Sequence, residues 1–62
     1  MLVKDIMVKC YDDQKFHIED YLFSCKCYFN GKNEDIPLEV QNLTVEEIMT
    51  TGTVLILKVS NL

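Results

Sequence analysis

The chain has 62 residues, enough for one small domain that we predict to span residues 1–62. It contains six Lys, no Arg and ten Asp or Glu, for a formal net charge of -4, and because phosphate recognition favours arginine forks and basic stripes, we expect no direct nucleic-acid binding. Three cysteines argue for a reducing compartment, and no apolar run approaches the roughly 20 residues of a membrane span, so we expect a cytoplasmic protein without a membrane partner.

The first half of the chain predicts two strands. Residues 2–11 alternate between apolar and polar side chains, which is typical of a half-buried strand. Residues 12–15 are polar and predict a turn. Residues 16–29 are too long for one regular strand, and their apolar positions change from even to odd numbers at Glu19 and Asp20. We therefore expect a bulge or a break at these two acids.

A third strand is predicted after a tight turn. Asn30 and Gly31 form the strongest short-range turn signal in the chain. Ile36, Leu38 and Val40 then alternate with polar residues and with Pro37, which lacks an amide donor. Residues 36–41 are therefore expected to form an edge strand.

The residues from 43 to 60 predict a short helix followed by a strand. Thr44 stands three residues before Glu47, the spacing of a capping box at a helix start, and Gly52 is suited to ending a helix. These signals predict a helix over 45–51. Residues 53–60 are rich in β-branched side chains and predict the last strand.

These elements, in the order strand, strand, strand, helix, strand, predict the fold class α+β. We expect a mostly antiparallel sheet of four or five strands with one short helix, and we favour an open sheet over a small barrel. The pleat of the last strand places Val54 and Ile56 on the face opposite Leu55 and Leu57. Because one short helix cannot cover both faces, we predict that Val54 and Ile56 are shielded by a curled sheet or by a second copy in a homodimer.

The cysteines and the single histidine are the candidates for chemistry. Cys25 and Cys27 lie two apart in a predicted strand, so we expect them to share a face as buried thiols that behave as small hydrophobic side chains. A zinc site built from Cys10, His17, Cys25 and Cys27 is an alternative, although the usual C-x-x-C spacing is missing. A Cys10–His17 nucleophilic dyad is a further alternative that lacks a third, orienting group. We therefore expect a non-enzymatic protein with a surface His17, no catalytic residues, no metal and no cofactor.

The acidic residues are concentrated in adjacent pairs. Eight of the ten form four such pairs, each in a predicted loop, bend or helix start, where water screens their repulsion. Solubility alone accounts for this pattern, but the same pairs also suit an acidic surface that binds a basic protein partner. Tyr11 and Tyr28 fall on polar faces and are candidate anchors for that partner. The predicted partner-binding residues are Tyr11, Asp12, Asp13, Glu19, Asp20, Tyr28, Glu34 and Asp35.

The function predicted from these features is a small acidic protein-binding module. The absence of Ala and Arg and the many Lys, Asn and Ile residues are typical of an AT-rich genome, such as that of a phage or mobile element. In size, charge and element order the chain resembles small acidic phage-encoded inhibitors, such as the anti-CRISPR proteins and the DNA-mimicking inhibitors of uracil-DNA glycosylase. That resemblance implies inhibition of a host protein that handles nucleic acid. The alternative is a structural or assembly homo-oligomer whose last strand forms the interface.

Overall fold

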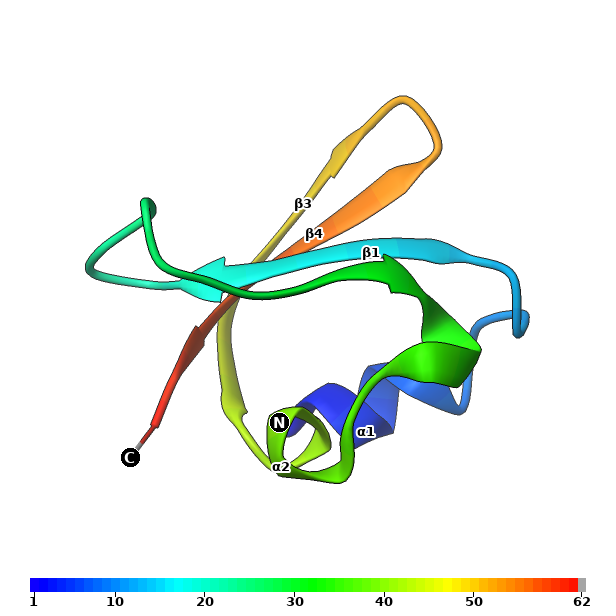
Figure 1. Cartoon of the computed structure of the whole chain (residues 1–62), viewed down its shortest axis with the longest axis horizontal. Helices are drawn as coiled ribbons and strands as arrows, with labels where there is room; N and C mark the ends of the chain where they lie inside the picture. The colour runs from blue at the N-terminus through cyan, green and yellow to red at the C-terminus, as the bar shows by residue number, and fades with distance from the viewer. Residues whose placement is uncertain (62) are drawn as a thin grey trace.

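The computed structural model describes residues 1–61 and shows an open four-stranded sheet with two short helices (Figure 1). Leu62, the last residue of the predicted domain, lies outside the described residues. The elements in chain order are α1 (Val3–Met7), β1 (Lys15–Asp20), β2 (Cys27–Lys32), the short 3-10 helix η1 (Asn33–Asp35), α2 (Leu38–Gln41), β3 (Thr44–Thr51) and β4 (Val54–Ser60).

The sheet is mixed, with the strand order β2-β1-β4-β3. The pairs β1–β2 and β3–β4 are antiparallel, whereas β1 and β4 run parallel at the centre. The predictions of an α+β class and an open four-stranded sheet are confirmed. The prediction of a mostly antiparallel sheet was too simple, because the segment with η1 and α2 crosses over so that β4 enters parallel to β1.

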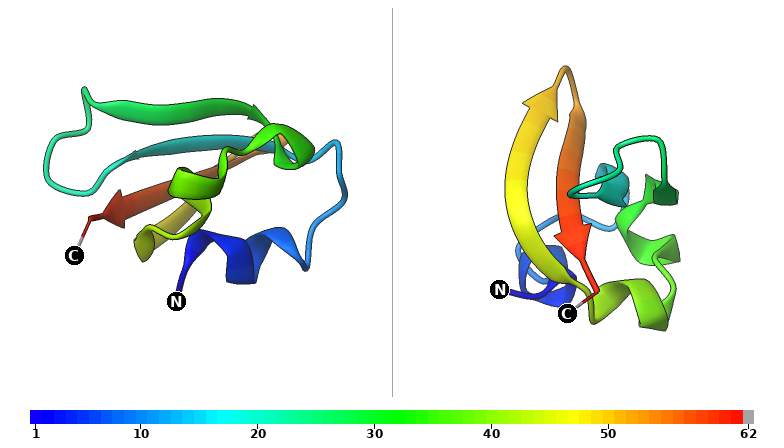
Figure 2. Two further views of the ribbon diagram at one scale, coloured as in Figure 1. Left: turned by 60° about the horizontal axis from the view of Figure 1, so that its bottom comes forward. Right: turned by 90° about the vertical axis from the view of Figure 1, so that its left-hand side faces the viewer.

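Both helices lie on the same side of the sheet (Figure 2). The core lies between the helices and this inner face of the sheet. Phe16 and Ile18 of β1 and Leu57 of β4 are fully buried on this inner face. The rest of the core consists of apolar side chains from β4, the helices and their flanking residues, namely Val59, Val3, Ile36, Val40 and Leu43. In the part of the chain that the structure describes, the opposite, outer face of the sheet has no helix over it.

The strand predicted over residues 2–11 was wrong, because Val3–Met7 is the helix α1. Val3, Ile6 and Met7 recur at the spacing of a helix, and all three pack in or against the core. Asp5 also caps this helix, since its Oδ2 accepts a hydrogen bond from the backbone amide of Leu2 at 2.9 Å. Val8, which the strand pattern placed beside Ile6, is 81% exposed.

The strand predicted over residues 36–41 was also wrong. Pro37 precedes the first turn of α2, a position where the missing amide donor costs nothing. Ile36, Val40 and Leu43 are buried at spacings of four and three residues, which is the period of a helix. Alternation over residues 36–41 alone does not distinguish the two-residue period of a strand from the 3.6-residue period of a helix.

The helix predicted over 45–51 is in fact the strand β3. Five of its eight residues are β-branched, and the strand pairs along its length with β4. Glu47 lies opposite Lys58 instead of closing a capping box. Gly52 adopts a positive φ of 58° in the turn of the β3–β4 hairpin, so its conformational freedom serves a strand reversal rather than a helix end.

The break predicted at Glu19 and Asp20 is confirmed, but the Asn30–Gly31 turn is not. The β1–β2 pairing shifts register between Ile18 and Glu19, and β1 ends at Asp20. The chain then reverses through residues 21–26. Asn30 and Gly31 lie inside β2, where a Cβ on Gly31 would stand 3.0 Å from the Phe29 ring. Gly31 therefore provides space for that ring.

Candidate functional site

The predicted partner-binding residues lie at the two opposite ends of β1 (Figure 1). We call the first group the acidic end, which consists of Tyr11, Asp12, Asp13, Glu34 and Asp35. These residues come from the loop before β1 and from η1, which follows β2. The second group consists of Glu19, Asp20 and Tyr28, near the loop that joins β1 to β2.

Hydrogen bonds hold the two halves of the acidic end together. The backbone amide of Glu34 donates to the carbonyl of Asp12 at 3.1 Å, and the amide of Asn33 donates to the carbonyl of Gln14 at 2.8 Å. Asn33 is 4% exposed, and its Nδ2 lies within hydrogen-bond distance of three carbonyls, those of Met7 at the end of α1 and of Cys10 and Tyr11 in the loop that follows. This loop therefore presents its carboxylates from a fixed backbone.

The charges of the acidic end are open to solvent. Tyr11 is 85% exposed, and within residues 1–61 none of the four acids of this end forms an ion pair. Lys15 and Lys32 face each other across β1 and β2 beside it. The acids thus form a local negative surface with lysines at its border.

Glu19 has a different environment from the acids of the acidic end. Its side chain is only 13% exposed. One carboxylate oxygen lies 2.9 Å from Nε2 of His17, and the other lies 3.5 Å from Nζ of Lys58. Glu19 is therefore part of a charged row on the outer face of the sheet.

Asp20 organises the loop between β1 and β2. Its Oδ2 accepts hydrogen bonds from the backbone amides of Leu22 at 3.0 Å and Phe23 at 2.9 Å, and its Oδ1 accepts one from the hydroxyl of Tyr28 at 3.1 Å. The Lys26 amide closes the turn on the Phe23 carbonyl at 2.9 Å. The loop is thus an Asx turn with its conformation fixed from both sides.

This turn exposes three consecutive large side chains, which we call the apolar tip: Tyr21, Leu22 and Phe23. Their exposed fractions are 47%, 77% and 64%. A hollow of about 310 Å³ lies beside the apolar tip and is also lined by Tyr28 and Val59. This feature was not predicted from the sequence, because alternation placed Tyr21 and Phe23 in a strand. Asp20 directly before the three residues was the available signal for a turn.

The Asp20 turn has a predicted pH dependence. The backbone N–H of Phe23 lowers the pKa of the Asp20 carboxyl from its ordinary value of 3.8; desolvation opposes this, while Tyr28, Leu22 and Lys26 add to it. A depressed pKa means that the carboxylate stabilises the turn fully above pH 3.8 and loses this effect as the pH falls through the lower folded value. We expect the amide resonances of Leu22 and Phe23 to titrate with a midpoint below 3.8, and not to titrate in Asp20→Asn. A midpoint at or above 3.8 would contradict the turn.

Val54 and Ile56, predicted for self-association, lie on the outer face of the sheet as expected. Both are half-buried. In the register of the sheet Ile56 stands between Met49 of β3, which is 40% exposed, and His17 of β1. Neighbouring side chains thus cover part of these two residues, and their role in self-association stays a prediction.

The predicted burial of Cys25 and Cys27 was wrong. Both thiols are exposed, because Cys25 lies in the turn and Cys27 on the outer face of β2, whereas Cys10 is half-buried against the core. His17 lies beside Cys27 rather than Cys10, with 4.0 Å between Nδ1 and Sγ. The proposed zinc ligands therefore do not gather, and within residues 1–61 no three His, Cys, Asp or Glu side chains are arranged to hold a metal.

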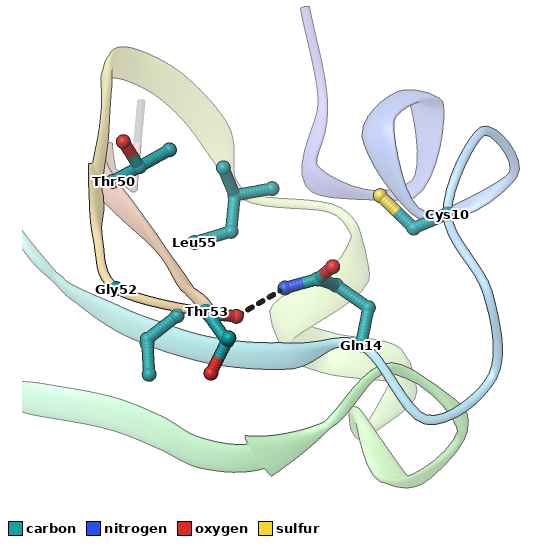
Figure 3. Close-up of a pocket in the computed structure, with 7 residues that line it drawn as sticks. Cys10, Gln14, Thr50, Gly52, Thr53 and Leu55 are labelled. Atoms are coloured by element: carbon teal, nitrogen blue, oxygen red, sulfur yellow. Dashed lines mark hydrogen bonds between the residues drawn. The ribbon is translucent and has the colours of Figure 1, made fainter.

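A second hollow, also of about 310 Å³, separates the loop after α1 from the tip of the β3–β4 hairpin (Figure 3). The side chain of Gln14 reaches across it and donates from Nε2 to the carbonyl of Thr53 at 2.8 Å. Its other lining groups are threonines, aliphatic carbons and the Cys10 thiol. This contact ties the hairpin to the loop before β1.

Comparisons with protein-family models, with curated proteins and with solved structures find no match for this chain. Among the described residues, neither helix has the length or the apolar character needed to cross a membrane.

Proposed function

We propose that this chain is a small, acidic, non-enzymatic protein-binding module. The observation that carries the proposal is the apolar tip. Its three large side chains are exposed to solvent on a loop whose conformation is fixed by hydrogen bonds of Asp20 and Tyr28. Aromatic side chains are frequent anchors of protein interfaces, and a preorganised loop loses little ordering entropy when it binds.

The charges of the acidic end favour binding to a partner with a basic surface. Its carboxylates are solvent-exposed, and the chain has a formal net charge of -4, so it attracts a basic partner over about 10 Å at ordinary ionic strength. A host protein that handles nucleic acid carries such a surface, which agrees with the resemblance to phage-encoded inhibitors. The acidic end would then steer the encounter, while the apolar tip provides the anchor.

Substituting Leu22 tests the anchor. We expect Leu22→Asp to weaken binding of the partner about 30-fold, the effect of losing a contact of about 2 kcal/mol. The immobilised chain is used to capture proteins from a lysate of the source cells, and the affinity of each captured protein is then measured with purified components. Leu38→Asp is the matched control, since Leu38 is 69% exposed on α2, far from the tip in the fold. Equal affinity of the Leu22→Asp and wild-type chains would reject the apolar tip as the anchor.

The same measurement separates steering from anchoring. Replacing the four acids of the acidic end by their amides is expected to slow association and to flatten its salt dependence, with little change in dissociation. A salt-independent association rate in the wild-type chain would reject the basic partner.

The homo-oligomer is the second candidate function. It is favoured by the uncovered outer face of the sheet, where Val54, Ile56 and Met49 lie in neighbouring positions. Sedimentation of the chain alone at two salt concentrations distinguishes the two functions. A concentration-dependent dimer that is insensitive to salt supports the oligomer, and a monomer at all concentrations supports the binding module.

A further inference from the structure

Three side chains on the outer face of the sheet form a connected line from a thiol to a carboxylate. Nδ1 of His17 lies 4.0 Å from Sγ of Cys27, and Nε2 of His17 lies 2.9 Å from Oε1 of Glu19. His17 and Glu19 are two apart on β1, and Cys27 pairs with Glu19 across β1 and β2. The register shift between Ile18 and Glu19 falls at this point of the ladder.

The hydrogen bonds select one tautomer of His17. A carboxylate only accepts, so the proton of a neutral imidazole lies on Nε2 and is donated to Glu19. Nδ1 is then an unprotonated acceptor that faces the sulfur of Cys27. Nζ of Lys58, 3.5 Å from Oε2 of Glu19, holds the carboxylate from its other side. Glu19 is thus a positioning residue for the imidazole.

We infer that Cys27 is a reactive thiol, activated by His17 and Glu19, that exchanges with low-molecular-weight disulfides. The Cys27 proton passes to Nδ1 of His17, and the resulting imidazolium is stabilised by the Glu19 carboxylate. The Cys27 thiolate attacks one sulfur of the disulfide, an S–S bond to the protein forms, and the S–S bond of the reagent breaks. The second sulfur leaves as a thiolate and takes the proton from His17, so the step needs no other oxidant.

The open position of Cys27 suits this class of reagent. The attacking thiolate must approach a disulfide along its S–S axis, and Cys27 is exposed on the outer face of the sheet. The Cys27 thiol has a second hydrogen-bond acceptor besides His17. Its Sγ lies 3.5 Å from the carbonyl of Phe29, to which the protonated thiol donates. That carbonyl holds the resting thiol, whereas His17 takes the proton when the thiol reacts.

The titratable and charged groups around this sulfur come from three elements. His17 and Glu19 belong to β1, Lys58 belongs to β4, and Glu47 of β3 lies opposite Lys58 in the same row. Lys26 precedes Cys27 in the chain, but its Nζ lies over the Tyr28 ring, 5.2 Å from the centroid. The one histidine therefore provides the base, and Glu19, held by Lys58, sets its orientation.

Cys25 provides an internal reference. It is exposed, it lies two residues from Cys27, and within residues 1–61 its side chain forms no hydrogen bond. A difference between the two thiols in the folded chain therefore reports the effect of His17 and Glu19.

The test compares two variants that each retain one thiol. Cys10→Ser/Cys25→Ser retains Cys27, and Cys10→Ser/Cys27→Ser retains Cys25. Each is mixed with oxidised glutathione, and the mixed disulfide is followed by mass spectrometry. At pH 7 we expect Cys27 to react about tenfold faster than Cys25, because His17 accepts the thiol proton as the sulfur attacks. Denaturant is expected to make the two rates equal.

Substitutions of the two supporting residues complete the test. His17→Asn is expected to bring the Cys27 rate to that of Cys25. Glu19→Gln is expected to reduce the reaction rate of Cys27 less than His17→Asn does. It is also expected to make the Cys27 rate fall more steeply between pH 8 and pH 6, a change that a purely structural role of Glu19 would not produce. Circular dichroism checks that each variant is folded, and His17→Gln replaces any His17→Asn chain that is not. Equal rates for the two thiols in the folded chain, or a Cys27 rate unchanged by both His17 variants, would overturn the inference. Neither outcome bears on the apolar tip.

Discussion

Phe16→Ala is expected to lower the free energy of unfolding by about 3 to 5 kcal/mol. Phe16 is completely buried at the centre of the sheet, where it contributes to the core between β1, β4 and the helices. Removing a buried phenyl ring costs about 3 to 5 kcal/mol, because the transfer free energy is lost and a cavity remains. A domain of this length has a total stability of about 3 to 9 kcal/mol. The single substitution therefore removes a large part of the free energy of unfolding.

Urea unfolding followed by circular dichroism measures this effect. Phe23→Ala is the matched control, since it deletes the same ring at a position that is 64% exposed. We expect it to change the free energy of unfolding by no more than about 0.5 kcal/mol. Equal losses from both substitutions would mean that the apolar tip is packed in solution, which would contradict its exposure.

Asn33→Asp is expected to destabilise the chain more than Asn33→Ala. The Nδ2 of Asn33 lies within hydrogen-bond distance of three backbone carbonyls, whereas its buried Oδ1 has no hydrogen-bond partner within residues 1–61. Alanine loses the three hydrogen bonds but also removes the unpartnered oxygen, so we expect a loss of about 1 to 3 kcal/mol. A carboxylate would instead face three carbonyl oxygens as an uncompensated buried charge, which costs about 3 to 5 kcal/mol.

The pH dependence distinguishes this electrostatic effect from a loss of packing. Burial and the facing carbonyls raise the pKa of the introduced carboxyl above its unfolded value of about 3.9. The penalty is therefore full above the folded pKa and is relieved as the pH falls below it, because the protonated carboxyl donates one hydrogen bond. Stability curves from pH 3 to pH 7 measure the relief. Asn30→Asp, the same change at an exposed position of β2, should show none.

The strand over 53–60 was the most reliable part of the sequence analysis. Its β-branched run is long enough to identify a strand, and the pleat correctly placed Leu57 in the core and Val54 on the other face. The break at Glu19 was also predictable, because a change of phase in the apolar pattern has few other structural explanations.

The helices and strands elsewhere were interchanged because the local signals were short and tertiary pairing decided the outcome. Thr44 and Glu47 satisfy the spacing of a capping box, but helix formation there would leave β4 without a partner on one side. In residues 2–11 the apolar positions fit both periods, and only the core they contact selects the helix. Whether such a segment forms a helix or a strand therefore depends on contacts with residues far away in the sequence.

The candidate site was predictable in part. The pair Asp12–Asp13 was placed in a loop, where the structure has it, whereas Glu34 and Asp35 lie in the short 3-10 helix η1. The proximity of the two pairs depends on the buried contacts of Asn33, which no local pattern indicates. The meeting of His17 with Cys27 likewise depends on the register of β1 and β2, so it became visible only with the fold.

The parallel pairing at the centre of the sheet also affects how the chain folds during synthesis. Asp20 of β1 pairs with Val59, near the end of β4, so the central strand lacks one neighbour until β4 has left the ribosome. The β1–β2 hairpin is available early, but an isolated two-stranded hairpin is marginally stable at best. We therefore expect the domain to fold only once β4 has been synthesised, with docking of the two hairpins as the slow step.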